Sequence, residues 1–386
     1  MKKNLLFILF AGFFFSSYSQ VTSLLSIKPR LQWPNANGYC GETSIQMCGL
    51  YYGNYISQDL CRTVAGGEVL INVNDTAALS AFSLNYSEWD PTVASPQYQN
   101  YLVWTKQFLQ KKQPVIITVY IQGLSDPDYD HIIPAIGFTG ANVNAYTGTD
   151  QLTYNSCFDT TSFTRAFSKL YDTRSMNGNG AVYSYCIPEY VNYGVAVTGI
   201  KDPSRQTKPV HMVLDSLDEP NITQGASARM MKAWITSDSL TPGQHYALLR
   251  YNNYLTVPAA GFNPSNANTS VYFTASAVQM TVKDSFLSNT AVFYRCIPYS
   301  PTGIASLHAD HASFFTVFPN PCSGTSTVTL PPDAEMLSVK NVLGQVIVER
   351  NVQQEETAEL NLTVSGIYFV SINVGQEQLV RKLIVR

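Results

Sequence analysis

The stretch Gly38-Tyr39-Cys40-Gly41-Glu42-Thr43-Ser44-Ile45-Gln46-Met47 organises the first half of this chain, because it sets a cysteine at the start of a predicted helix. Ile45, Cys48 and Tyr52 recur at helical spacing, so one face of this helix is predicted to pack. Cys40 then lies at the positive end of the helix dipole, where the pKa of a thiol is lowered and the thiolate is the nucleophile. Gly41 carries no side chain and leaves room for a substrate backbone.

The overall composition limits the class of protein. The chain has 386 residues, which predicts two or three domains. Its net charge is -3 and only 13% of its residues are charged, about half of the roughly 25% that is usual. The chain contains no basic cluster, so we expect no nucleic-acid partner. Its 24 tyrosines and 19 phenylalanines favour an aromatic-rich, largely β extracellular protein over a disordered chain.

The N-terminal residues predict a secretory signal peptide over residues 1–19. Two lysines, at positions 2 and 3, precede the apolar run Leu5 to Phe15, and small residues follow at Ser17 and Ser19. No later apolar run reaches the roughly 18 residues that a membrane-spanning helix needs. We therefore expect an exported protein without a transmembrane anchor.

Export permits disulfides, and the chain has seven cysteines. If Cys40 stays free as a nucleophile, the sequence does not decide how the others pair. Cys186 and Cys296 occur in similar contexts, Tyr-Cys-Ile-Pro and Arg-Cys-Ile-Pro. We expect a bridge between these two to close the region that they bound. Buried free thiols are the alternative for any of these cysteines.

The segments after the first helix have the pattern of an α+β domain over residues 20–182. Predicted helices run from Asn74 or Asp75 to Leu84 and from Gln97 to Lys111. Predicted strands run from Val115 to Tyr120, from His131 to Phe138 and from Gln151 to Phe158. The cysteine helix is therefore predicted to pack on an antiparallel sheet.

Four features of this domain resemble the papain-like cysteine peptidases, particularly the bacteriocin-processing type. They are Gln32, Cys40-Gly41, Asp130-His131 with the trailing Gly137-Phe138, and Tyr154-Asn155-Ser156. The resemblance covers roughly residues 28–175. It implies that Cys40 is the nucleophile, that His131 is the general base and then the general acid, and that Asn155 orients the imidazole. By the same resemblance, Gln32 and the backbone N–H of Cys40 form the oxyanion hole.

The implied activity is that of a cysteine peptidase or amide hydrolase, which acts on a peptide or protein and needs no cofactor and no metal. Gln32 lies farther upstream than in the family pattern, Glu42 replaces a frequent proline, and no Trp-Gly follows Asn155. Asp150 and Asp159 are alternative orienting residues. The alternative functions are a non-catalytic surface binding protein on the same fold, a transglutaminase-like acyl transferase and a peptidoglycan amide hydrolase.

Residues 183–300 have the pattern of a β-rich accessory domain. Short strands separated by Pro, Gly and Asn turns predict a β-sandwich-like region without a catalytic site. The predicted strands are Tyr193 to Ile200, Val210 to Ser216, Tyr246 to Tyr251, Val271 to Ala277 and Ala291 to Cys296. Residues 301–313 follow as a linker, in which His308 and His311 lack a third metal ligand, so a solvated linker is favoured over a metal site.

The last segment, residues 314–386, contains four motifs in order. They are Phe318-Pro319-Asn320-Pro321, Val339 to Val346 with Gly344-Gln345, Gly366-Ile367-Tyr368-Phe369-Val370 and Lys382-Leu383-Ile384-Val385-Arg386. Together they resemble the C-terminal sorting domain of type IX secretion, known from the Bacteroidetes. Alternating strands with Gly turns independently predict a small β-sandwich with about seven strands. The resemblance implies that the type IX secretion machinery is a partner and that the protein is secreted or attached to the outer cell surface.

Overall fold

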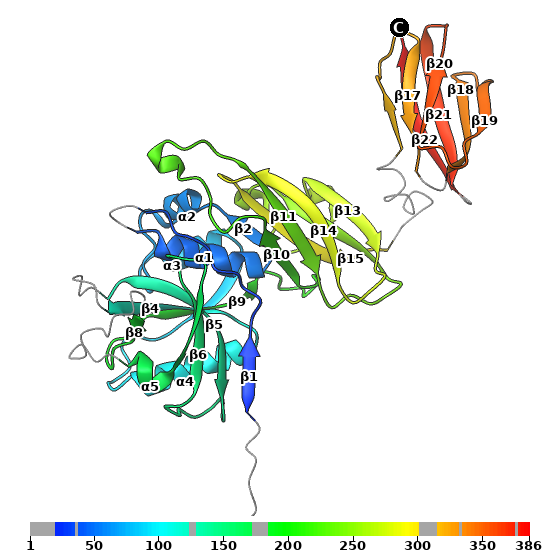
Figure 1. The fold of residues 1–386 in the computed structure, drawn as a ribbon. Coiled ribbons are helices and arrows are strands. Elements are labelled where there is room, and N and C mark those ends of the chain that lie inside the picture. The colour runs from blue at the N-terminus through cyan, green and yellow to red at the C-terminus, as the bar shows by residue number, and fades with distance from the viewer. Residues whose placement is uncertain are drawn as a thin grey trace, which may run out of the picture. The chain divides into compact units, whose positions relative to one another are not determined.

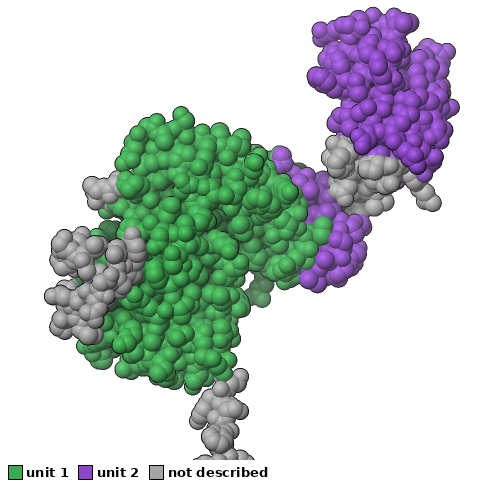
Figure 2. Space-filling model, in the orientation of Figure 1, with its two compact units in different colours: residues 1–239, 249–268, 279–296 green, residues 240–248, 269–278, 297–386 purple. Residues whose placement is uncertain are grey.

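A computed structural model describes residues 20–34, 38–122, 129–171, 184–300, 315–331, 334–374 and 377–386. The chain divides into two compact units, which Figure 2 colours separately. Unit 1 consists of residues 1–239, 249–268 and 279–296, and unit 2 of residues 240–248, 269–278 and 297–386. The predicted signal peptide and the predicted linker, with His308 and His311, lie outside the described residues.

Unit 1 contains an eight-stranded antiparallel sheet (Figure 1). Its strands are β1 (Val21–Leu24), β3 (Leu84–Glu88), β4 (Val115–Gln122), β5 (His131–Gly140), β6 (Gln151–Asn155), β7 (Ser162–Ala166), β8 (Ser184–Cys186) and β9 (Gly194–Ile200). The order is β3-β9-β4-β5-β6-β7, with β1 on β5 and β8 on β4. The predicted strands that begin near 115, 131 and 151 are therefore confirmed as neighbours in one antiparallel sheet.

The α-helices of unit 1 are α1 (Cys40–Tyr51), α2 (Gln58–Ala65), α3 (Asp75–Ala81), α4 (Tyr98–Gln110) and α5 (Phe167–Leu170). The start of α1 at Cys40 and the extent of α4 confirm two predictions. Helix α3 ends earlier than predicted, because Ser83 adopts a φ of 57° and Leu84 begins β3. The sequence patterns did not predict α2, which ends at Gly66 in the left-handed conformation that glycine favours.

Helix α1 is buried on all sides, from Gly41 to Leu50. Packing therefore extends beyond the one face that was predicted, because α1 contacts β5, β2 (Asn54–Ile56) and β10 (Val210–Leu214). Gly41 serves this packing: a Cβ atom there would lie 2.3 Å from the carbonyl oxygen of Val69. The space beside Gly41 is filled by Val69 and is not left for a substrate.

Residues 184–239, 249–268 and 279–296 belong to the same unit as the cysteine helix. β8 and β9 belong to the eight-stranded sheet, so the predicted boundary between residues 182 and 183 separates segments of one unit. A second sheet has the order β10-β11-β14, with β11 at Met230–Ser237 and β14 at Met280–Leu287. β15 (Ala291–Pro298) pairs with β2, which immediately follows α1. The remaining strands are β12 (His245–Tyr251) and β13 (Thr269–Thr274), and the short 3-10 helices are η1 (Ile222–Gln224), η2 (Tyr254–Thr256) and η3 (Pro264–Asn266).

All seven cysteines are free thiols. The predicted bridge between Cys186 and Cys296 is therefore wrong. Cys186 lies at the end of β8, where its thiol faces the carbonyl oxygen of Tyr120 at 3.9 Å. Cys296 lies in β15, where it forms an isolated backbone bridge with Lys208. The two similar sequence contexts thus belong to different sheets.

Residues 315–386, here called the C-terminal sandwich, form two antiparallel sheets around their own core. One sheet has the order β16-β17-β20, and the other β19-β18-β21-β22. The strands are β16 (Thr316–Phe318), β17 (Thr325–Thr329), β18 (Ala334–Asn341), β19 (Val346–Asn351), β20 (Thr357–Asn361), β21 (Gly366–Val374) and β22 (Glu377–Val385). The predicted β-sandwich is confirmed, and Gly344 (φ 77°) forms the turn between β18 and β19.

Candidate functional site

The predicted nucleophile, Cys40, is the first residue of α1 and is partly exposed. Its Sγ atom lies 3.9 Å from the carbonyl oxygen of Asp130, the residue that directly precedes β5. His131 is the first residue of β5. The packing of α1 on β5 therefore brings the N-terminus of the helix to the start of the strand that carries the predicted base.

The environment of Cys40 disfavours the thiolate in this conformation. Burial raises the pKa of the Cys40 thiol to about 12, and the carboxylates of Glu42 and Asp130 contribute to the increase. Backbone hydrogen bonds from Ile132 and Gly41 oppose it. The expectation of a lowered pKa is wrong for this conformation, because removing the charged sulfur from water outweighs the effect of the helix N-terminus.

The predicted base, His131, is almost fully buried, with 5% of its surface exposed. Its ring stacks on Phe158 at a centroid distance of 4.6 Å and an angle of 6°, and on Tyr185 at 5.1 Å and 27°. Burial lowers the pKa of His131 to about 3, so the imidazole is neutral near pH 7. Its Nε2 atom has no hydrogen-bond partner among the described residues, which costs about 1–3 kcal/mol when a polar atom is buried.

Asn155 ends β6, and its side chain is held away from the histidine by three contacts. Its amide nitrogen donates to the carbonyl oxygen of Ile27 at 3.0 Å and faces the sulfur of Met47 at 3.6 Å. Its amide oxygen accepts a hydrogen bond from Ser162 Oγ at 2.7 Å. These contacts attach β6 to the N-terminal segment, and none of them is to His131.

The two alternative orienting residues also have other partners. Asp150 is buried and forms an ion pair of 2.5 Å with Lys106, whose ammonium group also donates to the carbonyl oxygens of Asn142 and Ala145. Asp159 accepts a hydrogen bond from the backbone N–H of Thr161 at 2.7 Å. Lys106 lies in α4, and the sequence patterns did not predict that a lysine would be buried there.

Gln32 lies close to the segment that leads into Cys40. Its backbone N–H donates to the carbonyl oxygen of Cys157 at 2.8 Å. Its Nε2 atom lies 3.7 Å from the position that a Cβ atom on Gly38 would occupy, and its Oε1 atom is buried without a partner among the described residues. The side chain of Gln32, the predicted oxyanion residue, therefore lies beside Gly38, which precedes Cys40 by two residues along the chain.

A pair of charged residues holds the segment before Cys40. Arg62 Nε donates to Glu42 Oε1 at 2.6 Å, and Arg62 Nη2 donates to the carbonyl oxygen of Gly38. The guanidinium group also lies over the ring of Tyr39, 3.5 Å from its centroid. Glu42, which replaces a proline of the resembled family, thus has a structural partner on α2 that fixes the entry into α1.

Three residues of this site, Cys157, Phe158 and Tyr185, were not predicted from the sequence. Cys157 is buried behind Cys40: its thiol faces the carbonyl oxygens of Ile132 at 3.6 Å and of Cys40 at 3.9 Å. The sequence pattern could have predicted that Cys157 faces α1. Residues two apart along an extended segment point to the same side, and Asn155, two residues before Cys157, faces α1. No local pattern indicates that Phe158 and Tyr185 stack on His131, since these rings come from other segments.

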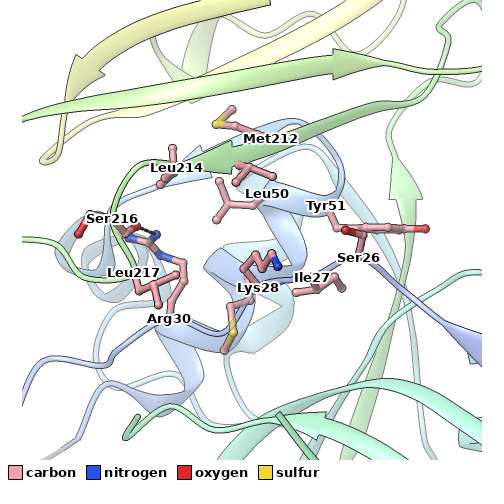
Figure 3. A pocket seen from close by; sticks show the side chains of 12 residues that line it. Ser26, Ile27, Lys28, Arg30, Leu50, Tyr51, Met212, Leu214, Ser216 and Leu217 are labelled. Carbon is pink, nitrogen blue, oxygen red and sulfur yellow. Dashed lines mark hydrogen bonds between the residues drawn. The ribbon is translucent and has the colours of Figure 1, made fainter. Parts of the chain in front are cut away.

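Figure 3 shows a small cavity between the N-terminal segment, the end of α1 and β10. Its walls include Arg30, Leu50, Met212 and Leu217, and its volume of about 20 Å³ suits a water molecule. Neither Cys40 nor His131 lines it. This cavity is therefore separate from the two proposed catalytic residues.

Two further observations concern ligands and membranes. Among the described residues, no group of three or more His, Cys, Asp or Glu side chains is arranged to hold a metal ion. In the same part of the chain, no helix is both long and apolar enough to cross a bilayer.

Comparison with known families identifies the C-terminal sandwich. Residues 316–386 match the family described as the secretion system C-terminal sorting domain. These residues are a type IX sorting domain. The sorting domain implies that the type IX secretion machinery is a partner, and it confirms the predicted localisation: the protein is exported, and it is attached to the outer cell surface or secreted.

Similar solved structures include two proteins of Porphyromonas gingivalis. PorZ, an essential bacterial surface component of the type IX secretion system, is 16% identical with a TM-score of 0.18, over 26% of this chain and 15% of PorZ. HBP35 is 14% identical with a TM-score of 0.14, over 46% of this chain and 64% of HBP35. The match thus spans less than two thirds of either protein, and such low TM-scores carry no argument about fold or function. No curated protein matches the chain.

Proposed function

We propose that the exported protein is a cysteine-dependent amide hydrolase that cleaves peptides or proteins at the junction of α1 and β5. The observation that carries the proposal is the position of Cys40: its sulfur lies at the N-terminus of α1, 3.9 Å from the carbonyl oxygen that directly precedes His131. A thiol at a helix N-terminus next to an imidazole is the arrangement that cysteine hydrolases use.

The proposed reaction assigns a role to each residue. The imidazole of His131 takes the proton of the Cys40 thiol, and the sulfur attacks the substrate carbonyl carbon. The resulting oxyanion is stabilised by the backbone N–H of Cys40 and by the side chain of Gln32. The imidazolium then protonates the leaving amine, and a thioester remains, which water hydrolyses with His131 as the base. The role of Asn155 in orienting His131 stays a prediction, and it requires the amide to leave Ile27 and Ser162.

A second candidate function is a surface binding protein that retains this site without turnover. The pKa directions of both groups favour it, because the pKa of Cys40 is raised to about 12 and that of His131 is lowered to about 3. With these values both groups are neutral near pH 7, and a neutral thiol reacts slowly with electrophiles.

Alkylation of Cys40 in the full chain by iodoacetamide, followed by peptide mass spectrometry from pH 4 to 9, separates the two functions. Under the hydrolase proposal, Cys40 reacts below the ordinary thiol pKa of about 8.5, and His131→Ala abolishes this reaction. His211→Ala is the matched control, because His211 is a partly exposed histidine of the same unit and bonds to the carbonyl oxygen of Tyr51. Reactivity that rises only above this pKa and ignores His131→Ala would favour the binding protein.

Hydrolysis itself is tested with a mixture of casein-derived peptides. The wild-type chain is expected to cleave peptides, and Cys40→Ala is expected to be inactive, because it removes the only proposed nucleophile. Cleavage that persists in Cys40→Ala contradicts the proposal.

A further inference from the structure

Two free thiols face the same short stretch of β5. The backbone N–H of Ile132 bonds to Cys40 Sγ, and the carbonyl oxygen of Asp130 lies 3.9 Å from the same sulfur. The carbonyl oxygen of Ile132 lies 3.6 Å from Cys157 Sγ, and Cys157 Sγ also lies 3.9 Å from the carbonyl oxygen of Cys40. Ile132 therefore has one thiol at its N–H and the other at its carbonyl oxygen.

The geometry of an extended strand makes these two sulfurs neighbours. The N–H and C=O groups of one strand residue point to the same side of the strand, which is why paired residues in antiparallel sheets exchange two hydrogen bonds. The amide nitrogen and the carbonyl oxygen of one residue are only about 3 Å apart, as the bond lengths of the backbone require. Cys40 and Cys157 thus approach β5 from the same side, at adjoining backbone atoms.

The two thiols differ in their access to solvent. Cys40 is partly exposed, whereas Cys157 is fully buried and its sulfur lies 3.8 Å from Ser44 Oγ. An oxidant therefore reaches Cys40 first, and Cys157 is the second thiol. The protein is exported, and export brings a chain into compartments where disulfides form and persist. The proposed hydrolysis uses Cys40 but gives no role to Cys157.

We propose that Cys40 and Cys157 form a reversible disulfide, which makes this pair a redox site at the junction of α1 and β5. The disulfide itself does not depend on the proposed hydrolase. Its consequence for activity rests on that proposed function, because a Cys40 sulfur that is bonded to Cys157 cannot attack a substrate carbonyl. Reduction of the disulfide restores the thiol.

The oxidant is a low-molecular-weight disulfide, and the reaction consists of two thiol–disulfide exchanges. The Cys40 thiolate attacks one sulfur of the oxidant, so that a mixed disulfide forms on Cys40 and one thiolate leaves. The Cys157 thiolate then attacks the Cys40 sulfur, and the second thiolate leaves. The two leaving thiolates take up the two protons lost by the cysteines, so two cysteine thiols are oxidised and the oxidant is reduced to two thiols. Burial raises the pKa of the Cys157 thiol, so the second exchange is expected to be the slower one.

Oxidised glutathione is the probe, and the full chain is incubated with it at about pH 8 over a range of ratios of oxidised to reduced glutathione. Free thiols are then blocked with N-ethylmaleimide, and the non-reduced peptides are mapped by mass spectrometry. Cleavage after Glu42 separates Cys40 from Cys48 in these peptides. We expect a peptide that links Cys40 to Cys157, in an amount that rises with the ratio and is removed by dithiothreitol. Iodoacetamide labelling of Cys40 is expected to fall about tenfold on oxidation and to recover on reduction.

Cys48→Ser is the matched control, because Cys48 is a buried cysteine of the same helix. We expect it to leave the linked peptide unchanged. In Cys157→Ser we expect the reaction to stop at the mixed disulfide of Cys40 with glutathione. The wild-type map overturns the proposal by itself if, at the highest ratio, Cys40 remains a mixed disulfide, remains reduced or links to another cysteine.

Peptide cleavage by the same samples separates this inference from the proposed function. If the linked peptide forms and the fully linked chain still cleaves peptides, the disulfide is supported and Cys40 is not the nucleophile of the hydrolase. If the reduced chain cleaves peptides and no linked peptide forms at any ratio, the hydrolase is supported and the disulfide is overturned. Loss of cleavage in step with the linked peptide, with recovery in dithiothreitol, supports both.

Discussion

The surroundings of α1 and the C-terminal sandwich are both well packed, but they bury different chemistry. Around α1 the buried side chains include the charged residues Arg30, Glu42 and Glu219. In the described part of the C-terminal sandwich, the buried polar residues are Ser326, Ser338 and Ser371, and no charged residue is buried. The stability of the region around α1 therefore depends on hydrogen bonds and ion pairs between buried polar groups. The stability of the C-terminal sandwich depends on the burial of apolar side chains.

The network around Glu219 shows how the first region is held. Glu219 accepts hydrogen bonds from Tyr55 OH at 2.6 Å, from the backbone N–H of Gln58 at 2.7 Å and from Gln46 Nε2 at 2.8 Å. Arg30 lies 3.9 Å from the same carboxylate and also donates to Gln46. Such a network specifies one arrangement, because each group loses its partner when another is removed.

The C-terminal sandwich follows a simpler rule. Along β17 and β20 every second residue is buried, and the outward residues are exposed. Its core consists of aliphatic side chains such as Leu337, Val339, Val370 and Leu383. A strict alternation of buried and exposed residues in a strand can be predicted from the sequence. A network of buried charges cannot, because it depends on contacts between distant segments.

The largest expected effect is the loss of the buried carboxylate in Glu219→Ala. We expect the free energy of unfolding of unit 1 to fall by about 3–5 kcal/mol, because Arg30 is left buried without its charge partner. All four tryptophans lie in residues of unit 1, so tryptophan fluorescence during urea unfolding reports on this unit. The control is Asp218→Ala at the adjacent position, where an exposed ion pair of 2.7 Å with Arg229 is lost. If the two variants lowered the free energy of unfolding equally, the buried network around Glu219 would contribute no more to stability than an exposed ion pair.

A second prediction concerns the apolar core of the C-terminal sandwich. Leu337 is fully buried in β18, so Leu337→Ala is expected to destabilise the sandwich by about 3 kcal/mol through lost burial and the cavity left behind. Hydrogen exchange of peptides from residues 334–374 measures this loss. Leu343→Ala, at a position that is 79% exposed, is the control and should change exchange little. If Leu337→Ala kept the wild-type protection from hydrogen exchange, the claim that apolar burial stabilises the sandwich would be contradicted.

The third prediction uses the buried carboxyl of Asp75. Burial raises the pKa of Asp75 to about 6, with a contribution from Glu88. Because the folded pKa lies above the unfolded value of about 3.9, the folded state binds the proton more tightly, and this stability is lost as the pH rises from about 4 through 6. Asp75→Asn is expected to raise the stability of unit 1 at pH 7 by about 2 kcal/mol.

The measurement for Asp75 is urea unfolding by tryptophan fluorescence at several pH values between 4 and 7. The wild-type stability should decline over this interval relative to Asp75→Asn. Parallel curves for the two chains would show that the carboxyl titrates normally in the folded state. Asp90→Asn is the control, since hydrogen bonds from Thr92 lower the pKa of this exposed aspartate.

The smallest effect is expected from an exposed ion pair of the C-terminal sandwich. Arg350 and Glu355 are 2.9 Å apart, with 39% and 37% of their side-chain surfaces exposed. Glu355→Gln should change the stability of the sandwich by less than about 1 kcal/mol, because water screens the pair. Hydrogen exchange over residues 334–374 tests this, and a loss similar to that of Leu337→Ala would show that charge pairing matters in both regions.

Local patterns predicted a large part of the architecture. The start of α1 at Cys40, the extent of α4 and the strands that begin at Val115, His131 and Gln151 all follow from residue periodicity. The C-terminal sandwich was predicted in the same way. The patterns also placed Cys40 and His131 at element starts, and the packing of α1 on β5 brings these starts together.

The features that the sequence did not predict depend on contacts between segments that are distant along the chain. Whether Asn155 reaches His131 or Ile27 depends on how the N-terminal segment crosses β6. The free state of Cys186 and Cys296 depends on which sheets contain them. Short patterns carry no information about such contacts, because they describe only residues that are neighbours along the chain.

The sequence by itself determined many of the helices and strands, the position of the cysteine at a helix start and the presence of a sorting domain, since these depend on local periodicity and ordered motifs. Only the tertiary structure decided that β9 joins the sheet on which the cysteine helix packs, and that Phe158 stacks on His131. It also decided the pKa directions of Cys40 and His131. The physical reason is desolvation, because the cost of a charge depends on every segment that excludes water from it.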